Sequence, residues 1–249
     1  MTDELLLAIE TSGDLGGVAL AQGARLLASR HLSADRRHTA ELLPTIRDLL
    51  AAQARRLPDV ALFAYSSGPG SFTGLRVAAT VGRTMQSVTG CRVVAVPTLE
   101  VIARNALSCP DAPPRIVALL DAGRGQVYGA AFERVDSVVG GPPGDDLRPV
   151  VSAGLFKPDA LLARVARPFC ILGPGVRQHA AACAASGGIV LDAACWPPSV
   201  EQVALLGWRL ACAGRVCRPH EILPLYIRPP ECEEVYEQRR AAARRKRGE

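Results

Sequence analysis

Hydrophobic and polar positions along the first half of the chain follow two periodicities, one typical of strands and one typical of helices. Short apolar runs bounded by small residues, such as LLLAIE at 5–10, predict strands. In RRHTAELLPTIRDLL, Leu42, Ile46 and Leu49 recur at helical spacing, which predicts an amphipathic helix. The predicted elements of this half are strands at 5–10, 18–22 and 25–31, a helix at 39–55, a strand at 60–66, a helix at 73–89, a strand at 92–96 and a helix at 98–107 capped by Thr98.

The second half of the chain repeats the pattern that opens the first. IVALLD (116–121), the turn AGRGQ and the run VYGAAFE again give a strand that ends in an acid, a turn of small residues and a returning strand, as LLLAIETSGDLGGVAL does at the start. The two hairpins therefore predict two halves of a duplicated α/β fold. The remaining predicted segments are a linker at 108–114, a loop at 136–146 and helices at 158–165 and 199–212.

Composition restricts the class of protein. Over 249 residues, 49% are hydrophobic, which fits a water-soluble protein with a sizeable core. No apolar run approaches the ~20 residues that span a bilayer, and the opening MTDELLLAIE lacks the positive start of a signal peptide. We therefore expect a cytoplasmic protein without membrane contact.

Charge and cysteine content change this picture little. The net charge of +5 is concentrated in a C-terminal tail, 231–249, which we expect to be disordered; tRNA phosphate is a candidate target for it. The eight cysteines form no C-x-x-C pair and have no histidine partner at zinc-ligand spacing, so no metal site is expected.

GPGSFTGLR, at 68–76, is the most unusual stretch, because it combines three glycines with a hydroxyl residue on each side of Phe72 between a predicted strand and a predicted helix. It fits neither the dinucleotide-binding pattern, nor the P-loop, nor the nucleophile elbow. Three interpretations stay open: an anion bound at the helix start, Ser71–Gly74; a sharp turn in which Gly74 lets the helix pack closely; and a surface bound by another protein through Phe72 and Arg76.

Two acids end the first strands of the two halves. Glu10 and Asp121 could face one cleft as paired carboxylates, or each could simply be an acid beside a turn. With Thr11, Ser12 and Arg124 they form the set of candidate nucleotide-facing residues.

The order of motifs along the chain resembles the TsaB (YeaZ) family of bacterial tRNA threonylcarbamoyladenosine biosynthesis. The resemblance covers most of the chain and rests on LLLAIETSG, RRHTAELLPTIRDLL, GPGSFTGLRV, VVAVPTLEVIA, DAGRGQVYGAAF and LPLYIR. It implies the ASKHA fold of actin, Hsp70 and sugar kinases, with two ribonuclease-H-like lobes, which we expect at 1–107 and 108–230.

The resemblance also implies a function without chemistry of its own. The catalytic relative TsaD transfers a threonylcarbamoyl group to the adenosine beside the anticodon of tRNAs that read codons starting with A. TsaD-type sequences carry a metal-binding H-x-x-x-H in the segment that corresponds here to PTLEVIARNAL (97–107), which has no histidine. The expected function is therefore binding and activation of a TsaD-type subunit, together with a TsaE-type ATPase and, through the complex, tRNA.

In the family, the TsaD-facing surface is built from the first two helices of the first lobe. The predicted partner-binding residues are Leu42, Leu43, Ile46, Gly68, Pro69, Gly70, Ser71, Phe72, Thr73, Gly74, Leu75, Arg76 and Arg83. The chain alone could pair with a second copy through these helices. No cofactor is expected on the chain itself, with ATP or ADP as candidate ligands at the complex interface. The alternative function is an ASKHA-fold ATPase or phosphotransferase that uses the cleft near Glu10 and Asp121.

Overall fold

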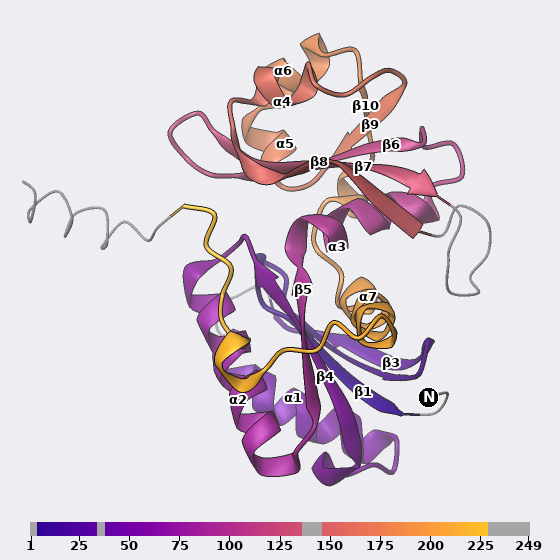
Figure 1. The fold of residues 1–249 in the computed structure, drawn as a ribbon, viewed down its shortest axis with the longest axis vertical. Coiled ribbons are helices and arrows are strands. Elements are labelled where there is room, and N and C mark those ends of the chain that lie inside the picture. Colours follow the sequence, from indigo (N-terminus) through magenta and orange to yellow (C-terminus); the bar gives the residue numbers. More distant parts are fainter. Residues whose placement is uncertain (1–3, 34–37, 136–145, 229–249) are drawn as a thin grey trace, which may run out of the picture.

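Two five-stranded mixed sheets organise the chain, one above the other in Figure 1. The computed structural model describes residues 4–33, 38–135 and 146–228. The first sheet has the order β3-β2-β1-β4-β5, with β1 antiparallel to β2 and parallel to β4. Its strands are β1 (Leu5–Glu10), β2 (Gly17–Gln22), β3 (Arg25–His31), β4 (Val60–Gly68) and β5 (Arg92–Pro97).

The second sheet repeats the topology of the first. Its order is β10-β9-β6-β7-β8, with β6 antiparallel to β7 and parallel to β9. Numbered from its own first strand, each sheet therefore has the order 3-2-1-4-5, which confirms the duplicated fold predicted from the two hairpins. The strands are β6 (Arg115–Asp121), β7 (Val127–Val135), β8 (Asp146–Phe156), β9 (Phe169–Leu172) and β10 (Ile189–Val190).

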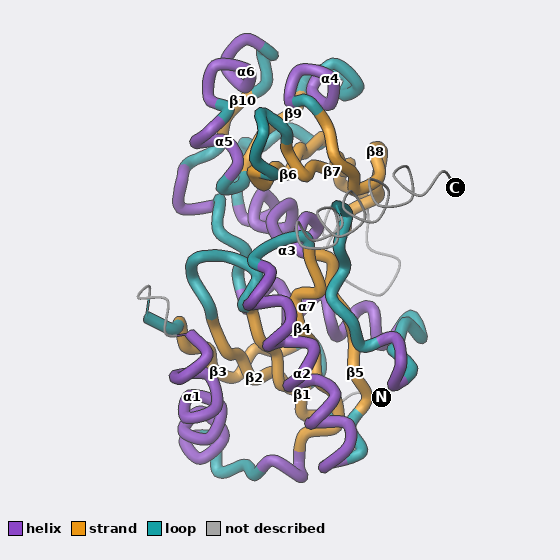
Figure 2. Tube along the Cα trace, turned by 90° about the vertical axis from the view of Figure 1, so that its left-hand side faces the viewer, coloured by secondary structure: helices purple, strands orange, loops and turns teal. Residues whose placement is uncertain are grey.

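Helices cover both faces of the first sheet, which is why every residue of β1 is buried. Leu5, Leu7 and Ile9 point to the side covered by α1 (His38–Ala52) and α2 (Phe72–Thr89). Leu6 and Ala8 point to the opposite side, covered by α7 (Val200–Cys212). Because side chains alternate between the two faces of a strand, β1 contributes to two separate hydrophobic cores. Figure 2 shows the side of the sheet that α1 and α2 cover.

The second sheet is covered by α3 (Thr98–Asn105) on one face and by three short helices on the other. The short helices are α4 (Pro158–Leu162), α5 (Gly175–Gln178) and α6 (Ala180–Ala185). Single 3-10 turns complete the described chain: η1 (Leu57–Asp59), η2 (Ala106–Ser108), η3 (Ala193–Cys195) and η4 (Pro219–Glu221). None of the described helices is both long and apolar enough to cross a membrane.

The predicted elements are confirmed, with corrections at their ends. The helix predicted at 158–165 ends at Leu162, and that predicted at 39–55 ends at Ala52. Thr98 does not cap α3, because Pro97 occupies the N-cap position and the buried Thr98 Oγ1 has no hydrogen-bond partner. The loop predicted at 136–146 lies outside the described residues except for Asp146, which begins β8. The tail at 231–249 also lies outside them.

One helix does not pack with the lobe to which its position in the sequence would assign it. The helix α7 belongs to the range 108–230 in sequence, yet it packs on β1, β2, β4 and β5 of the first sheet. The boundary at 107/108 remains a prediction, whereas the helix itself, predicted at 199–212, is confirmed with Ser199 as its N-cap.

The segment after α7 returns across the first lobe, and we call residues 217–228 the C-terminal strap; it is the yellow segment beside α2 in Figure 1. Its backbone is bound to the first sheet at two points: Cys217 N–H donates to Val93 O (2.8 Å) near the start of β5, and Leu225 N–H donates to Ser67 O (2.7 Å) near the end of β4. Between these bonds, Ile222 is fully buried in the core beneath α1 and α2.

The end of the strap reaches the second lobe. Arg228 donates to Ala122 O (2.8 Å) and to Gln126 Oε1 (2.5 Å), both in the turn between β6 and β7. The strap therefore connects the two lobes beyond the covalent crossings of the chain.

Ile222→Ala should destabilise the protein by about 2 to 4 kcal/mol, because it leaves a cavity in a closed core. The neighbouring Leu223→Ala is the matched control: its side chain is 50% exposed, and its carbonyl keeps the bond from Tyr65 Oη. We expect the control to change stability by no more than about 0.5 kcal/mol. Urea unfolding followed by circular dichroism measures both. Equal effects of the two substitutions would show that the strap is not part of the core.

Candidate functional site

A groove runs along the surface between α1 and α2. It encloses about 450 Å³ and is lined by Leu42, Leu43, Phe72, Thr73, Arg76, Val77, Thr80 and Val81. Leu43 is 62% exposed and Phe72 is 41% exposed. Large apolar side chains thus face solvent between the two helices.

The helical periodicity of α1 separates its buried side chains, which include Leu42 at the base of the groove, from its exposed ones. Leu42 and Ile46 are one turn apart and buried against the sheet. Leu43 follows Leu42 by about 100° around the helix axis and therefore points outward. Both leucines fit the apolar pattern of the sequence, but only Leu43 remains open to solvent.

The start of α2 is fixed by a close contact between two turns. Ser71 N–H donates to Ser12 O (2.8 Å), and Thr11 Oγ1 donates to Gly74 O (2.8 Å). A Cβ on Gly74 would lie 1.8 Å from Thr11 O, and one on Gly70 would lie 2.5 Å from Ser12 O. The glycines are therefore needed for close approach, as one interpretation of the sequence proposed.

The same turn is held from the other side by the C-terminal strap. Gly68 has φ +127°, and a Cβ there would lie 2.5 Å from Leu225 O. The ring of Phe72 stacks on Tyr226 with centroids 5.5 Å apart, and the Arg76 guanidinium lies 4.7 Å from the centroid of Phe72. Phe72 is thereby fixed between the strap and Arg76 at the end of the groove.

The structure divides the thirteen predicted partner-binding residues into three groups. Five line the groove: Leu42, Leu43, Phe72, Thr73 and Arg76. Five build the turn at the start of α2: Gly68, Pro69, Gly70, Ser71 and Gly74. The other three are buried or contact the strap: Ile46 and Leu75 are buried, and Arg83 Nε donates to Ile222 O (2.9 Å).

Sequence reasoning missed Val77, Thr80 and Val81 as groove residues. Each follows a groove residue of α2 by four positions, so the i, i+4 rule applied from Thr73 and Arg76 would have found them.

The proposed anion site at the start of α2 has fewer available donors than its sequence indicates. Gly74 N–H donates to Ser71 Oγ (3.3 Å), and Ser71 N–H is bonded to Ser12 O. The first and the last N–H group of the segment Ser71–Gly74 are thus already bonded, one to the neighbouring turn and the other to the N-cap side chain. Anion binding there remains a prediction.

Glu10 is enclosed within the first lobe. Its Oε1 accepts from Ser12 N–H and from Ser12 Oγ, each at 2.5 Å, and its Oε2 accepts from Ser66 Oγ. The residue is 1% exposed, and burial raises the pKa of its carboxyl despite these hydrogen bonds. Thr11 and Ser12 are buried as well.

Asp121 and Arg124 lie at the hairpin end of the second lobe. Asp121 Oδ1 is 3.1 Å from His179 Nε2, next to α5, and Arg124 has φ +55° in the turn bound by Arg228. The two acids are thus bonded within different lobes, and only Asp121 reaches the surface. Among the described residues, no group of three or more His, Cys, Asp or Glu side chains is placed to hold a metal ion.

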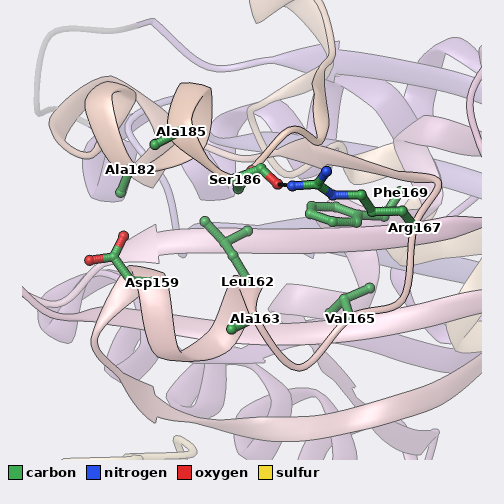
Figure 3. A pocket seen from close by; sticks show the side chains of 9 residues that line it. All are labelled: Asp159, Leu162, Ala163, Val165, Arg167, Phe169, Ala182, Ala185 and Ser186. Atoms are coloured by element: carbon green, nitrogen blue, oxygen red, sulfur yellow. Dashed lines mark hydrogen bonds between the residues drawn. The ribbon is translucent and has the colours of Figure 1, made fainter.

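A further cavity of about 400 Å³ opens in the second lobe between α4 and α6 (Figure 3). Leu162 points into it from α4, and Arg167 closes one end by donating to Ser186 O. None of the predicted site residues lines this cavity.

Glu10→Gln should reduce the dependence of stability on pH. A carboxyl whose folded pKa is raised above the unfolded value of about 4.5 stabilises the fold at low pH, and that contribution is lost as pH rises towards the folded pKa. The free energy of unfolding of the wild type, relative to Glu10→Gln, should therefore fall as pH increases from about 4.5. Urea unfolding over a pH series measures this, with the exposed Asp14→Asn in the same turn as control. A difference that grows with pH would contradict the burial argument.

Comparisons with known proteins agree with the geometry. The profile of the family described as "TsaD: tRNA N6-adenosine threonylcarbamoyltransferase" matches residues 31–155. The chain is 26% identical over 226 residues to the tRNA threonylcarbamoyladenosine biosynthesis protein TsaB of Escherichia coli, covering 90% of this chain and 94% of that protein. The TsaB of Bacillus subtilis is 26% identical over 231 residues, covering 92% and 96%.

A solved structure extends the similarity to the whole fold. YeaZ from Pseudomonas aeruginosa superimposes with a TM-score of 0.74 at 27% identity, covering 90% of this chain and 99% of that one. With two lobes of equal topology, the chain has the ASKHA fold. It belongs to the TsaD family and, within it, to the TsaB (YeaZ) proteins.

Proposed function

We propose that this chain acts in the formation of threonylcarbamoyladenosine in tRNA, as a non-catalytic protein that binds and activates a TsaD-type threonylcarbamoyltransferase. The substrate is the adenosine next to the anticodon of tRNAs that read codons starting with A. The observation that carries the proposal is the apolar groove between α1 and α2, at the helices predicted to bind the partner.

The groove has the chemistry of a protein-binding surface. Exposed Leu43 supplies apolar area, and Phe72 supplies an aromatic ring held rigidly by Tyr226 and Arg76. Rigid aromatic and arginine side chains in a partly enclosed apolar site are typical of the residues that dominate protein interfaces. An apolar helical face of the partner is the complementary chemistry.

The position of the missing histidines supports a non-catalytic role. The segment that carries H-x-x-x-H in TsaD-type sequences is α3 here, where Leu99, Ile102 and Ala103 are buried in the core of the second lobe. The helix also buries Arg104, which is paired with Asp146 (3.4 Å). Its side chains are thus used for packing between the lobes.

The proposal includes a TsaE-type ATPase in the same assembly, tRNA reached through the complex, and ATP or ADP at its interface. In the absence of the partner, the groove is also the surface through which two copies of the chain would associate. The alternative of an ATPase or phosphotransferase is less well supported, because Glu10 is enclosed and both of its oxygens accept hydrogen bonds from serines.

Reconstituted tRNA modification tests the function directly. The TsaD-type enzyme of the same organism, the adenylate-forming enzyme and the TsaE-type ATPase are combined with substrate tRNA, with and without this chain. We expect modification to depend on the chain, and the chain to coelute with the TsaD-type enzyme in size-exclusion chromatography. Full modification without it, and no complex, would contradict the proposal. ATP turnover by the isolated chain would favour the phosphotransferase alternative.

Leu43→Glu tests the surface. A charge in the groove should weaken binding of the TsaD-type enzyme by roughly tenfold or more, because the carboxylate would be desolvated in an apolar interface. Val150→Glu in β8 is the matched control, since Val150 is also exposed (44%) but lies in the second lobe. Isothermal titration calorimetry gives both affinities, and circular dichroism checks folding. Equal losses for the two variants, or none, would place the interface elsewhere.

A further inference from the structure

The chain crosses between the two sheets twice, and each crossing carries a cysteine. The first crossing runs from β5 through α3 and η2 into β6, and Cys109 directly follows η2. The second runs from β10 through η3 into α7, and Cys195 ends η3. The two Sγ atoms are 3.7 Å apart.

Backbone hydrogen bonds hold both cysteines in place. Cys109 N–H donates to Ala106 O (3.1 Å), and Cys109 O accepts from the Arg134 guanidinium (3.2 Å). Cys195 N–H donates to Asp192 O (3.0 Å), and Cys195 O accepts from Asn105 Nδ2 (2.9 Å). Asn105 belongs to the first crossing, so the two crossings are already joined beside the sulfur atoms.

The other described cysteines lack this arrangement. Cys91, Cys170 and Cys183 are buried. Cys212 and Cys217 are partly exposed, as Cys109 and Cys195 are, but among the described residues the sulfur–sulfur contact joins Cys109 and Cys195. Cys195 also lines a surface pocket of about 520 Å³ together with Asn105 and Ser108. A small reagent can therefore reach one sulfur of the pair from solvent.

We propose that Cys109 and Cys195 are the site of a reversible disulfide, formed by exchange with a low-molecular-weight disulfide, that fastens the two crossings between the lobes to each other. This inference goes beyond the proposed function and does not depend on it.

The exchange needs only the reagent and the two thiols. The thiolate of one cysteine attacks a sulfur of the reagent, RSSR, which forms a mixed disulfide and releases one RS⁻. The thiolate of the second cysteine then attacks the protein sulfur of the mixed disulfide and releases the second RS⁻. The two protons lost by the cysteines leave as two RSH, so the protein is oxidised by two electrons and RSSR is reduced by two.

The bond would close a loop that holds the whole second sheet, from β6 to β10. A cross-link across so long a loop restricts the unfolded chain strongly. It would also limit rotation of one lobe against the other, because both connections between the sheets would be fastened at one point.

Peptide mapping tests the proposal on the full-length protein. The reduced chain is incubated with excess glutathione disulfide, free thiols are blocked with iodoacetamide in denaturant, and the protein is digested with trypsin without reduction. We expect a peptide of 105–115 linked to one of 178–209, lower in mass by two hydrogens than the sum of the two. The second peptide also contains Cys183, so the cross-link must persist in Cys183→Ser and be absent in Cys195→Ser.

Two further readouts separate a specific bond from random oxidation. Cys195→Ser should retain one glutathione on Cys109, since the resolving thiol is gone. The oxidised wild type should melt roughly 5 to 10 °C above the reduced protein, and dithiothreitol should reverse the shift. Recovery of both thiols unmodified after excess reagent, or linkage of Cys109 to Cys170 or Cys183 instead, would overturn the proposal.

Discussion

The contact between the Thr11 carbonyl and the backbone of Gly74 is the constraint on which the rest of the first lobe depends. Two turns from distant parts of the chain approach so closely that no side-chain carbon fits between them. This contact fixes where α2 begins and brings Phe72 to the end of the groove. It also places Gly68 where the strap can bind. The proposed binding surface therefore depends on a backbone contact as well as on the side chains that line the groove.

Much of the fold could be predicted because its strongest signals are local. Both hairpins contain an apolar run, a turn of small residues and a second run, and each predicted pair of strands is present. The sequence did not predict the strands β8, β9 and β10 or the short helices α5 and α6. The three strands have weak patterns. β8 contains Pro149 and is largely exposed, β9 has only four residues, and β10 consists of two exposed residues at a sheet edge. β8 and β10 gain little from burial because they are largely exposed, whereas β9 is fully buried but too short to show a periodicity in the sequence.

In the candidate site, too, local sequence patterns could not predict the position of individual side chains. The periodicity of α1 identified an apolar face but could not decide that Leu42 is core and Leu43 is surface, because that depends on the angle at which the helix meets the sheet. The environment of Glu10 could not be predicted because it depends on a residue far away in the sequence. Its enclosure depends on Ser66, which is 56 residues away, and its role as a buried acid became visible only when β1 and β4 were paired. Likewise, α7 could be predicted as a helix but not assigned to the first sheet.

The return of α7 and the strap to the first lobe has a consequence for synthesis on the ribosome. The second sheet uses one contiguous stretch, from Arg115 to Val190, and can close as soon as that stretch has emerged. The first sheet was translated earlier, but it lacks the cover for Leu6 and Ala8 until α7 appears and lacks Ile222 until almost the end. The lobe made first is therefore completed last, so the nascent chain exposes an apolar sheet face for most of its elongation and is then most prone to aggregation or to capture by chaperones.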